Sequence, residues 1–124
     1  MELVHGHLSF GAPAGVRNWS LDPYSVEVQS DPASFYAGLR ERGAFSYLPQ
    51  YSMLACGQYN VVREVFSDHE RFVSSRGVGV QDFALEDPWR PPSIILEVDP
   101  PDHNRTRRVL MRALSPKAVA DLRA

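Results

Sequence analysis

Two nitrogen-donating side chains, His103 and Arg107, stand four residues apart in the stretch EVDPPDHNRTRRVL. Asp99 and Pro100 predict that a helix begins there, because aspartate is a favoured N-cap and proline a favoured first helical residue. At about 100° per residue, His103 and Arg107 share a side of this helix with two later leucines. An inward donor or cation without a partner is costly, so the pair needs an anion. Its source is either a carboxylate elsewhere in the chain or an anionic ligand.

The opposite side of the same predicted helix, which extends to about Leu114, carries three arginines: Arg105, Arg108 and Arg112. Residues 103–124 hold six basic residues and one acidic residue, whereas residues 1–102 hold seven basic and fourteen acidic residues. The basic surface is therefore local to the end of the chain. It is either a solvated face or a docking surface that steers an acidic partner.

The remaining candidate ligands form no catalytic or metal-binding pattern. His5 and His7 have no partner cluster, so we expect them to be surface residues and predict no metal site. Cys56 is the only cysteine, which excludes an internal disulfide and favours a reducing, cytoplasmic setting. We expect Cys56 to be a buried, unreactive strand residue.

Several elements must position these side chains. Ser30-Asp31-Pro32 predicts the start of a helix that extends to about Arg42, with Phe35 and Leu39 facing inward. Periodicity then predicts two strands of a hairpin, 44–48 and 52–56, and a helix over 58–67. Residues 1–29 are expected to form an N-terminal arm. Residues 68–98 lack a period but hold several aromatic and branched apolar residues, which predicts an ordered binding loop.

Composition sets the class of protein. With 44% hydrophobic and 23% charged residues, the chain is expected to be globular. It has no apolar run of 18 residues and no signal-peptide pattern, so we expect a soluble protein. At 124 residues it has the length of one domain or part of one, and it ends about two turns into a predicted helix that begins at Ser115. This ending predicts a fragment.

The stretch LEVDPPDHNRTRRVLMRALSP resembles the C-helix region of the cytochrome P450 family, the haem-thiolate monooxygenases, whose pattern there is D-P-P-x-H-x-x-x-R. The order of helix, hairpin, helix and long loop upstream is similar to the family's helix A, helix B and B to C loop. The resemblance implies the N-terminal third of the cytochrome P450 fold, which is mainly α with a small β-sheet (α+β). Residues 1–124 would then be one partial domain.

The resemblance also implies a cofactor and a redox partner. His103 and Arg107 correspond to the pair that donates to the haem propionates. The arginines on the other side, Arg105, Arg108 and Arg112, would lie on the surface that docks an iron-sulfur ferredoxin, which a reductase supplies with electrons. The family's thiolate lies in a later F-x-x-G-x-x-x-C-x-G pattern that Cys56 does not fit. We therefore expect no catalytic residue in this segment and no activity from the chain alone.

Two loop stretches, SSRGVGVQDF and PWRPPSIILEVDPPDH, are similar to a bacterial subgroup that oxidises para-substituted benzoates, including O-demethylation of 4-methoxybenzoate. In that subgroup the arginine and serine of R-P-P-S hold the substrate carboxylate, which implies this role for Arg90 and Ser93. Ile95 and Leu96 would line the apolar part of the pocket. Alternatively, Arg90 is an ordinary surface arginine of the loop.

Two other readings of the chain stay open. The helices joined at Leu114-Ser115-Pro116, one of them basic, are also compatible with a helix-turn-helix that binds nucleic acid. The acidic remainder of the chain argues against it. A third reading is a noncatalytic truncated product that folds poorly or serves only to bind a partner. Our leading prediction includes neither nucleic acid nor a membrane as a partner, and it expects a monomer.

Overall fold

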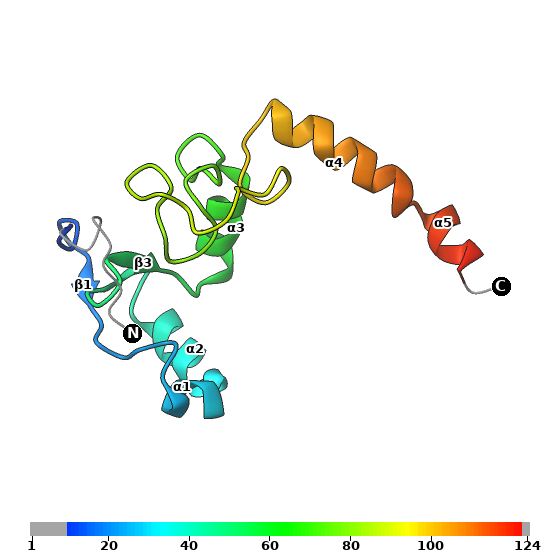
Figure 1. Ribbon diagram of the computed structural model, residues 1–124. Coiled ribbons are helices and arrows are strands. Elements are labelled where there is room, and N and C mark those ends of the chain that lie inside the picture. Colours follow the sequence, from blue (N-terminus) through cyan, green and yellow to red (C-terminus); the bar gives the residue numbers. More distant parts are fainter. Residues whose placement is uncertain (1–9, 123–124) are drawn as a thin grey trace. The chain divides into compact units, whose positions relative to one another are not determined.

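The computed structural model describes residues 10–122, and the chain divides into two compact units, Met1–Arg71 and Phe72–Ala124. Each unit is described by itself. The first unit contains β1 (Arg17–Asn18), α1 (Val26–Ser30), α2 (Pro32–Glu41), β2 (Ser46–Leu48), β3 (Met53–Ala55) and α3 (Tyr59–Ser67). The second contains a long loop followed by α4 (Asp102–Ala113) and α5 (Pro116–Asp121) (Figure 1). The mainly α fold with a small sheet is confirmed.

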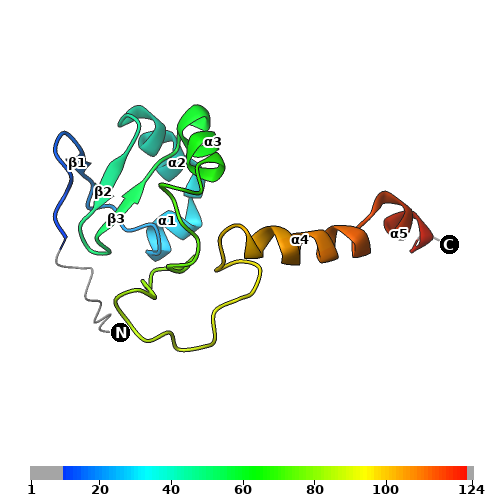
Figure 2. The same ribbon diagram turned by 90° about the horizontal axis from the view of Figure 1, so that it is seen from above.

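The sheet of the first unit has the strand order β1-β2-β3 (Figure 2). The predicted hairpin is confirmed, because β2 and β3 pair antiparallel with Tyr47 opposite Leu54. β1 pairs parallel with β2, and Arg17 lies opposite Ser46. The sequence predicted regular structure only from Ser30 onward, and that prediction was wrong. A two-residue polar strand has no alternation to detect, and its partner lies far along the chain.

The core of the first unit forms where α1 and α2 meet the start of the sheet. Val28, Phe35 and Leu39 are buried, and the Phe35 ring stacks on Trp19 with centroids 4.7 Å apart. The predicted cap of α2 is confirmed, because the Asp31 carboxylate accepts a hydrogen bond from the backbone N–H of Ser34. Burial of these apolar side chains supplies most of the driving force for this packing.

Arg42 joins the end of α2 to the sheet. Its guanidinium lies 5.1 Å from the centre of the Trp19 ring and donates to the Asn18 carbonyl oxygen at 2.6 Å. A second donor, Nε, lies 3.3 Å from Ser46 Oγ. These contacts hold β1 in place although β1 has few residues.

α3 begins one residue later than predicted. Val61 is its only buried side chain, and Phe66 is 86% exposed. The apolar stripe that predicted this helix is therefore only partly covered by the described residues. The helix ends at Asp68, whose carboxylate binds Arg71 through Nε at 2.5 Å.

The loop that opens the second unit contains no helix or strand, as the sequence predicted. An ion pair between Arg76 and Asp82 and a backbone hydrogen bond from Phe83 N–H to the Arg76 carbonyl oxygen, at 2.8 Å, fold its first part back on itself. The Asp99 carboxylate accepts hydrogen bonds from the backbone N–H groups of Ser74 and Ser75, at 2.8 and 3.1 Å. These bonds join the two ends of the loop.

The predicted start of α4 was wrong. Asp99 does not cap the helix, which begins at Asp102 after Pro101 as N-cap. The Asp99 carboxylate already accepts hydrogen bonds from the loop. Pro100 is followed by Pro101, and a residue that precedes a proline avoids the helical region of the backbone. The predicted cap of α5 is confirmed, because Ser115 Oγ accepts a hydrogen bond from the Ala118 N–H.

Candidate ligand and cofactor sites

An ion pair between a half-buried arginine and a buried carboxylate is the main feature of the loop. Arg90 Nη1 donates to Glu97 Oε2 at 2.7 Å, and Arg90 Nη2 donates to Glu97 Oε1 at 2.6 Å. The Glu97 side chain is 1% exposed and the Arg90 side chain 34% exposed. The guanidinium also lies 5.5 Å from the centre of the Trp89 ring. Parallel hydrogen bonds of this kind fix both the distance and the orientation of the two planar groups.

Ser93 shapes the turn that carries this pair. Its backbone N–H donates to Glu97 Oε2 at 2.7 Å, and its Oγ accepts hydrogen bonds from the N–H groups of Ile95 and Leu96, at 3.4 and 3.2 Å. The Glu97 carboxylate thus holds both the arginine and the turn. The role of Ser93 as a ligand contact stays a prediction. In the structure its hydroxyl accepts hydrogen bonds from the backbone of the loop.

Hydrogen bonding keeps the Glu97 carboxylate ionised. The bonds from Arg90 lower the pKa of Glu97 most, and the backbone N–H of Ser93 lowers it further, against the opposite effect of burial. The same contact raises the pKa of Arg90. The site therefore contains a carboxylate and a guanidinium that are both charged near neutral pH.

The Arg90–Glu97 pair borders a cavity of about 300 Å³. The cavity is lined by Val78, Gly79, Val80, Gln81, Phe83, Trp89, Arg90 and Glu97. Its walls combine aromatic and aliphatic side chains with the amide of Gln81 and the charged Arg90–Glu97 pair. Of the residues predicted to line a pocket, Ile95 is half-buried and Leu96 is 58% exposed, and neither borders this cavity.

Glu97 was not among the predicted site residues. It is the only acidic residue in the stretch Ile94-Ile95-Leu96-Glu97-Val98, and a lone glutamate in an apolar run was the available signal. Gln81 was also missed. Its Nε2 donates to the Asp87 carbonyl oxygen at 2.9 Å, while its Oε1 is buried and accepts no hydrogen bond from the described residues.

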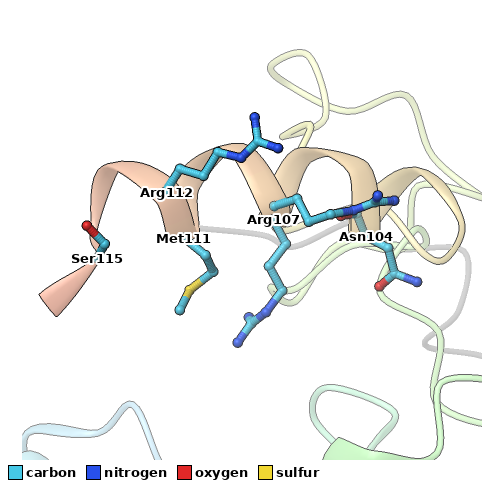
Figure 3. Close-up of a pocket in the computed structure, with 6 residues that line it drawn as sticks. Asn104, Arg107, Met111, Arg112 and Ser115 are labelled. Atoms are coloured by element: carbon cyan, nitrogen blue, oxygen red, sulfur yellow. The ribbon is translucent and has the colours of Figure 1, made fainter. Parts of the chain in front are cut away.

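A second candidate site is a groove of about 710 Å³ along α4 (Figure 3). It is lined by Asn104, Arg107, Arg108, Met111, Arg112 and Ser115. Figure 3 shows Arg107 and Met111 on one side of the helix and Arg112 turned away from them. The groove thus brings together members of both predicted stripes, whereas His103 and Arg105 do not line it.

The basic residues of α4 differ in their contacts. Arg105 lies 3.5 Å from the Asp102 carboxylate, and Arg108 Nε donates to the Asn104 carbonyl oxygen at 3.3 Å. Within residues 10–122, His103 and Arg107 form no side-chain hydrogen bond or ion pair. Within the described residues of the second unit, no carboxylate contacts either side chain.

Cys56 and the histidines near the N-terminus complete the predicted residues. Cys56 is half-buried just after β3, and burial raises the pKa of its thiol, which favours the protonated form over a thiolate. His5 and His7 lie outside the described residues. No group of three or more His, Cys, Asp or Glu side chains within the described range could hold a metal ion.

Comparison with known proteins identifies the family. The sequence is 46% identical to cytochrome P450 CYP199A2 of Rhodopseudomonas palustris over 110 residues, which are 89% of this chain and 27% of that protein. The fold matches the structure of cytochrome P450 CYP109Q5 from Chondromyces apiculatus with a TM-score of 0.64 and 32% sequence identity, over 83% of this chain and 27% of that one. The chain is homologous to cytochrome P450 proteins. No family model matches the sequence.

The chain spans about a quarter of the length of each matched cytochrome P450. Neither comparison supports the nucleic-acid-binding alternative. No helix within residues 10–122 has the length and apolar character needed to cross a membrane.

The residues of α4 fit the haem of a cytochrome P450 in their chemistry. His103 and Arg107 lie one turn apart on the helix, and neither has a partner among the described residues. Arg107 also shares its groove with the apolar side chain of Met111. A cationic donor beside apolar surface suits a ligand that is flat, hydrophobic and carries carboxylates at its edge.

Proposed function

We propose that the chain is the N-terminal part of a soluble, cytoplasmic haem-thiolate monooxygenase that oxidises an aromatic carboxylic acid such as a 4-substituted benzoate. The observation that carries the substrate class is the position of Arg90, whose guanidinium borders a cavity otherwise lined largely by apolar side chains. In this proposal Arg90 and Ser93 bind the carboxylate. Ile95 and Leu96 do not border the cavity, so they would contribute apolar contacts only outside it. The remainder of the enzyme would supply the thiolate cysteine.

His103 and Arg107 would hold the haem through its propionates. When bound, haem supplies the oxygen chemistry that the protein side chains cannot perform. The described residues would instead orient their ligands. A planar guanidinium that holds one end of a rigid aromatic acid limits the directions in which the para substituent can point.

The outer face of α4 would receive electrons from an iron-sulfur ferredoxin and its reductase. Arg112 supports this role best, because it is the one of the three proposed docking arginines with no side-chain bond to another described residue. A positive surface accelerates the approach of an acidic protein. We propose that the complete enzyme acts as a monomer with this partner.

The substrate class is tested with the full-length protein. Binding of 4-methoxybenzoate and of its uncharged amide is measured by isothermal titration calorimetry for the unchanged protein and for Arg90→Gln/Glu97→Gln. The double variant is preferable to Arg90→Ala, because removing the arginine alone leaves a buried, unpaired carboxylate.

The pair should confer a preference for the acid. We expect the double variant to lose about tenfold or more of its affinity for the acid, since a charge-assisted contact is lost, while affinity for the amide changes little. Equal losses for both ligands would contradict carboxylate binding at Arg90. Formation of 4-hydroxybenzoate and formaldehyde by the full-length protein with a ferredoxin and reductase would test the reaction itself.

A further inference from the structure

We propose that Glu97 is a specificity-determining residue that shares the Arg90 guanidinium with the acid ligand and thereby limits how tightly any carboxylate binds. This inference rests on the proposed function and deepens it. Glu97 already forms a bidentate pair with Arg90 and borders the same cavity, so a ligand carboxylate at Arg90 would be the second anion at a single cation.

The free edge of the guanidinium determines where the ligand would bind. Glu97 occupies the edge formed by Nη1 and Nη2, and the other hydrogen of Nη1 is donated to the Pro91 carbonyl oxygen at 3.0 Å. The edge formed by Nε and the second hydrogen of Nη2 makes no hydrogen bond with the described residues. An arginine has five N–H donors, so this edge can still donate two hydrogen bonds to a second carboxylate that lies beside Glu97.

Displacement of Glu97 by the ligand is less favourable than this shared arrangement. The Glu97 side chain is 1% exposed, and its Oε2 also accepts the Ser93 N–H at 2.7 Å. A ligand that expelled Glu97 would leave this N–H and a buried carboxylate without partners. Glu97 therefore stays in place, and the ligand takes the remaining edge.

The consequence is a weaker preference for acids over neutral ligands. Two carboxylates on one guanidinium repel each other, whereas an amide at the same edge is not repelled. Glu97 thus reduces the preference for acids that Arg90 alone would produce. Selection among ligands then depends more on their contacts with the apolar walls of the cavity. Substrate release also becomes faster, because most changes in affinity between related complexes appear in the dissociation rate.

The experiment compares full-length Glu97→Gln with the unchanged protein, again by calorimetric titration with 4-methoxybenzoate and its amide. Glutamine keeps the shape of the side chain and removes its charge. We expect affinity for the acid to rise about tenfold, since a like charge close to the ligand is removed, and affinity for the amide to stay within about twofold. An unchanged or reduced affinity for the acid would overturn the proposal.

A second comparison does not depend on the folding of that variant. Arg90→Gln is compared with Arg90→Gln/Glu97→Gln, in which neither side chain is charged. The comparison is made at alkaline pH, which favours the ionised carboxylate of Glu97 in the single variant. The proposal then requires the single variant to bind the acid more weakly than the double variant, because the Glu97 charge lies beside the ligand, and equal affinities would overturn it. If the unchanged protein and both of these variants show the same ratio of acid to amide affinity, carboxylate binding at Arg90 itself fails, and the proposed substrate class fails with it.

Discussion

The buried carboxylate of Glu97 limits which hydrogen-bond donors of Arg90 are available to a ligand. Arg90 was predicted from sequence as a substrate contact, and the structure places both of its terminal nitrogens on Glu97. Such a pair is costly to break from one side, because the remaining charge stays buried. Loss of the arginine alone is therefore best compared with loss of both charged groups.

The pH dependence of stability follows from the lowered pKa of Glu97. Because the folded-state pKa lies below the unfolded value of about 4.3, the stabilisation is complete above that value. It is lost as the pH falls through the folded-state pKa. In the full-length protein, the difference in Tm between the unchanged form and Glu97→Gln should therefore be largest near pH 6 to 7 and shrink below about pH 4.

Glu41→Gln is the matched control for this pH series. Glu41 is an exposed glutamate at the end of α2. Its substitution should change Tm little, as for most surface positions. A Glu97→Gln difference that stays constant from pH 7 to pH 3 would contradict the proposed contribution of the ionised carboxylate.

Arg107 should matter more for haem retention than its neighbours on the outer face of α4. In the full-length protein, Arg107→Ala should speed the transfer of haem to apomyoglobin by roughly tenfold, since a charge-assisted contact to a propionate is lost. Arg112→Ala is the control, because both arginines line the same groove but Arg112 points away from Arg107. Equal haem transfer from the two variants would argue against propionate binding by Arg107.

At the scale of elements, side chains hold the long loop in place of helices or strands. The Asp99 carboxylate joins its ends, and the Arg76–Asp82 pair closes its first turn. A loop with a cavity and a buried ion pair needs such bonds, because its ordering entropy must be offset locally. As a result, Asp99 binds the loop and does not cap α4, although its position in the sequence predicted a cap.

Gly77 is the glycine of this loop that tolerates substitution least. Its φ is +110°, and an added Cβ would lie 2.5 Å from the Gln81 carbonyl oxygen. Gly77→Ala should lower the free energy of unfolding by about 1–3 kcal/mol, measured by urea denaturation of the full-length protein. Gly79→Ala is the control, since an added Cβ there meets nothing within 4 Å. Similar losses in both variants would contradict this account.

At the scale of the whole molecule, much apolar surface has no cover from the described residues. No residue of α4 is buried, and four apolar positions on it or at its C-cap are at least 42% exposed: Val109, Leu110, Met111 and Leu114. Exposed apolar patches of this kind mark surfaces that bind other groups. The matched cytochrome P450 proteins are about four times longer, and in the proposed full-length enzyme the additional residues would cover these side chains.

The exposed apolar side chains of α4 should bind a hydrophobic dye. The 124-residue chain should bind the hydrophobic dye ANS strongly, with several times the fluorescence per molecule of the full-length protein. Leu114→Ser/Val109→Ser should reduce the signal of the short chain. The interpretation would be contradicted if the short chain bound no more dye than the full-length protein.

Local chemistry determined the features that the sequence predicted well. The caps at Asp31 and Ser115, the hairpin and the absence of regular structure in the loop each depend on a few neighbouring residues, which can be read in order. The motif that begins at Asp99 likewise indicated the family. The short strand β1 was missed because pairing with β2 joins residues that are far apart in the chain.

Only the tertiary structure decided which partner each charged residue takes. The sequence by itself places Arg90 and Glu97 seven residues apart in a loop without a period, and Asp99 far from Ser74. Their meeting depends on how the loop folds back, which no local propensity specifies. Sequence thus determined which charged, polar and apolar groups are available in the loop and on α4. The fold decided that Arg90 already holds a carboxylate, because a buried charge must be paired wherever the chain brings an opposite charge within reach.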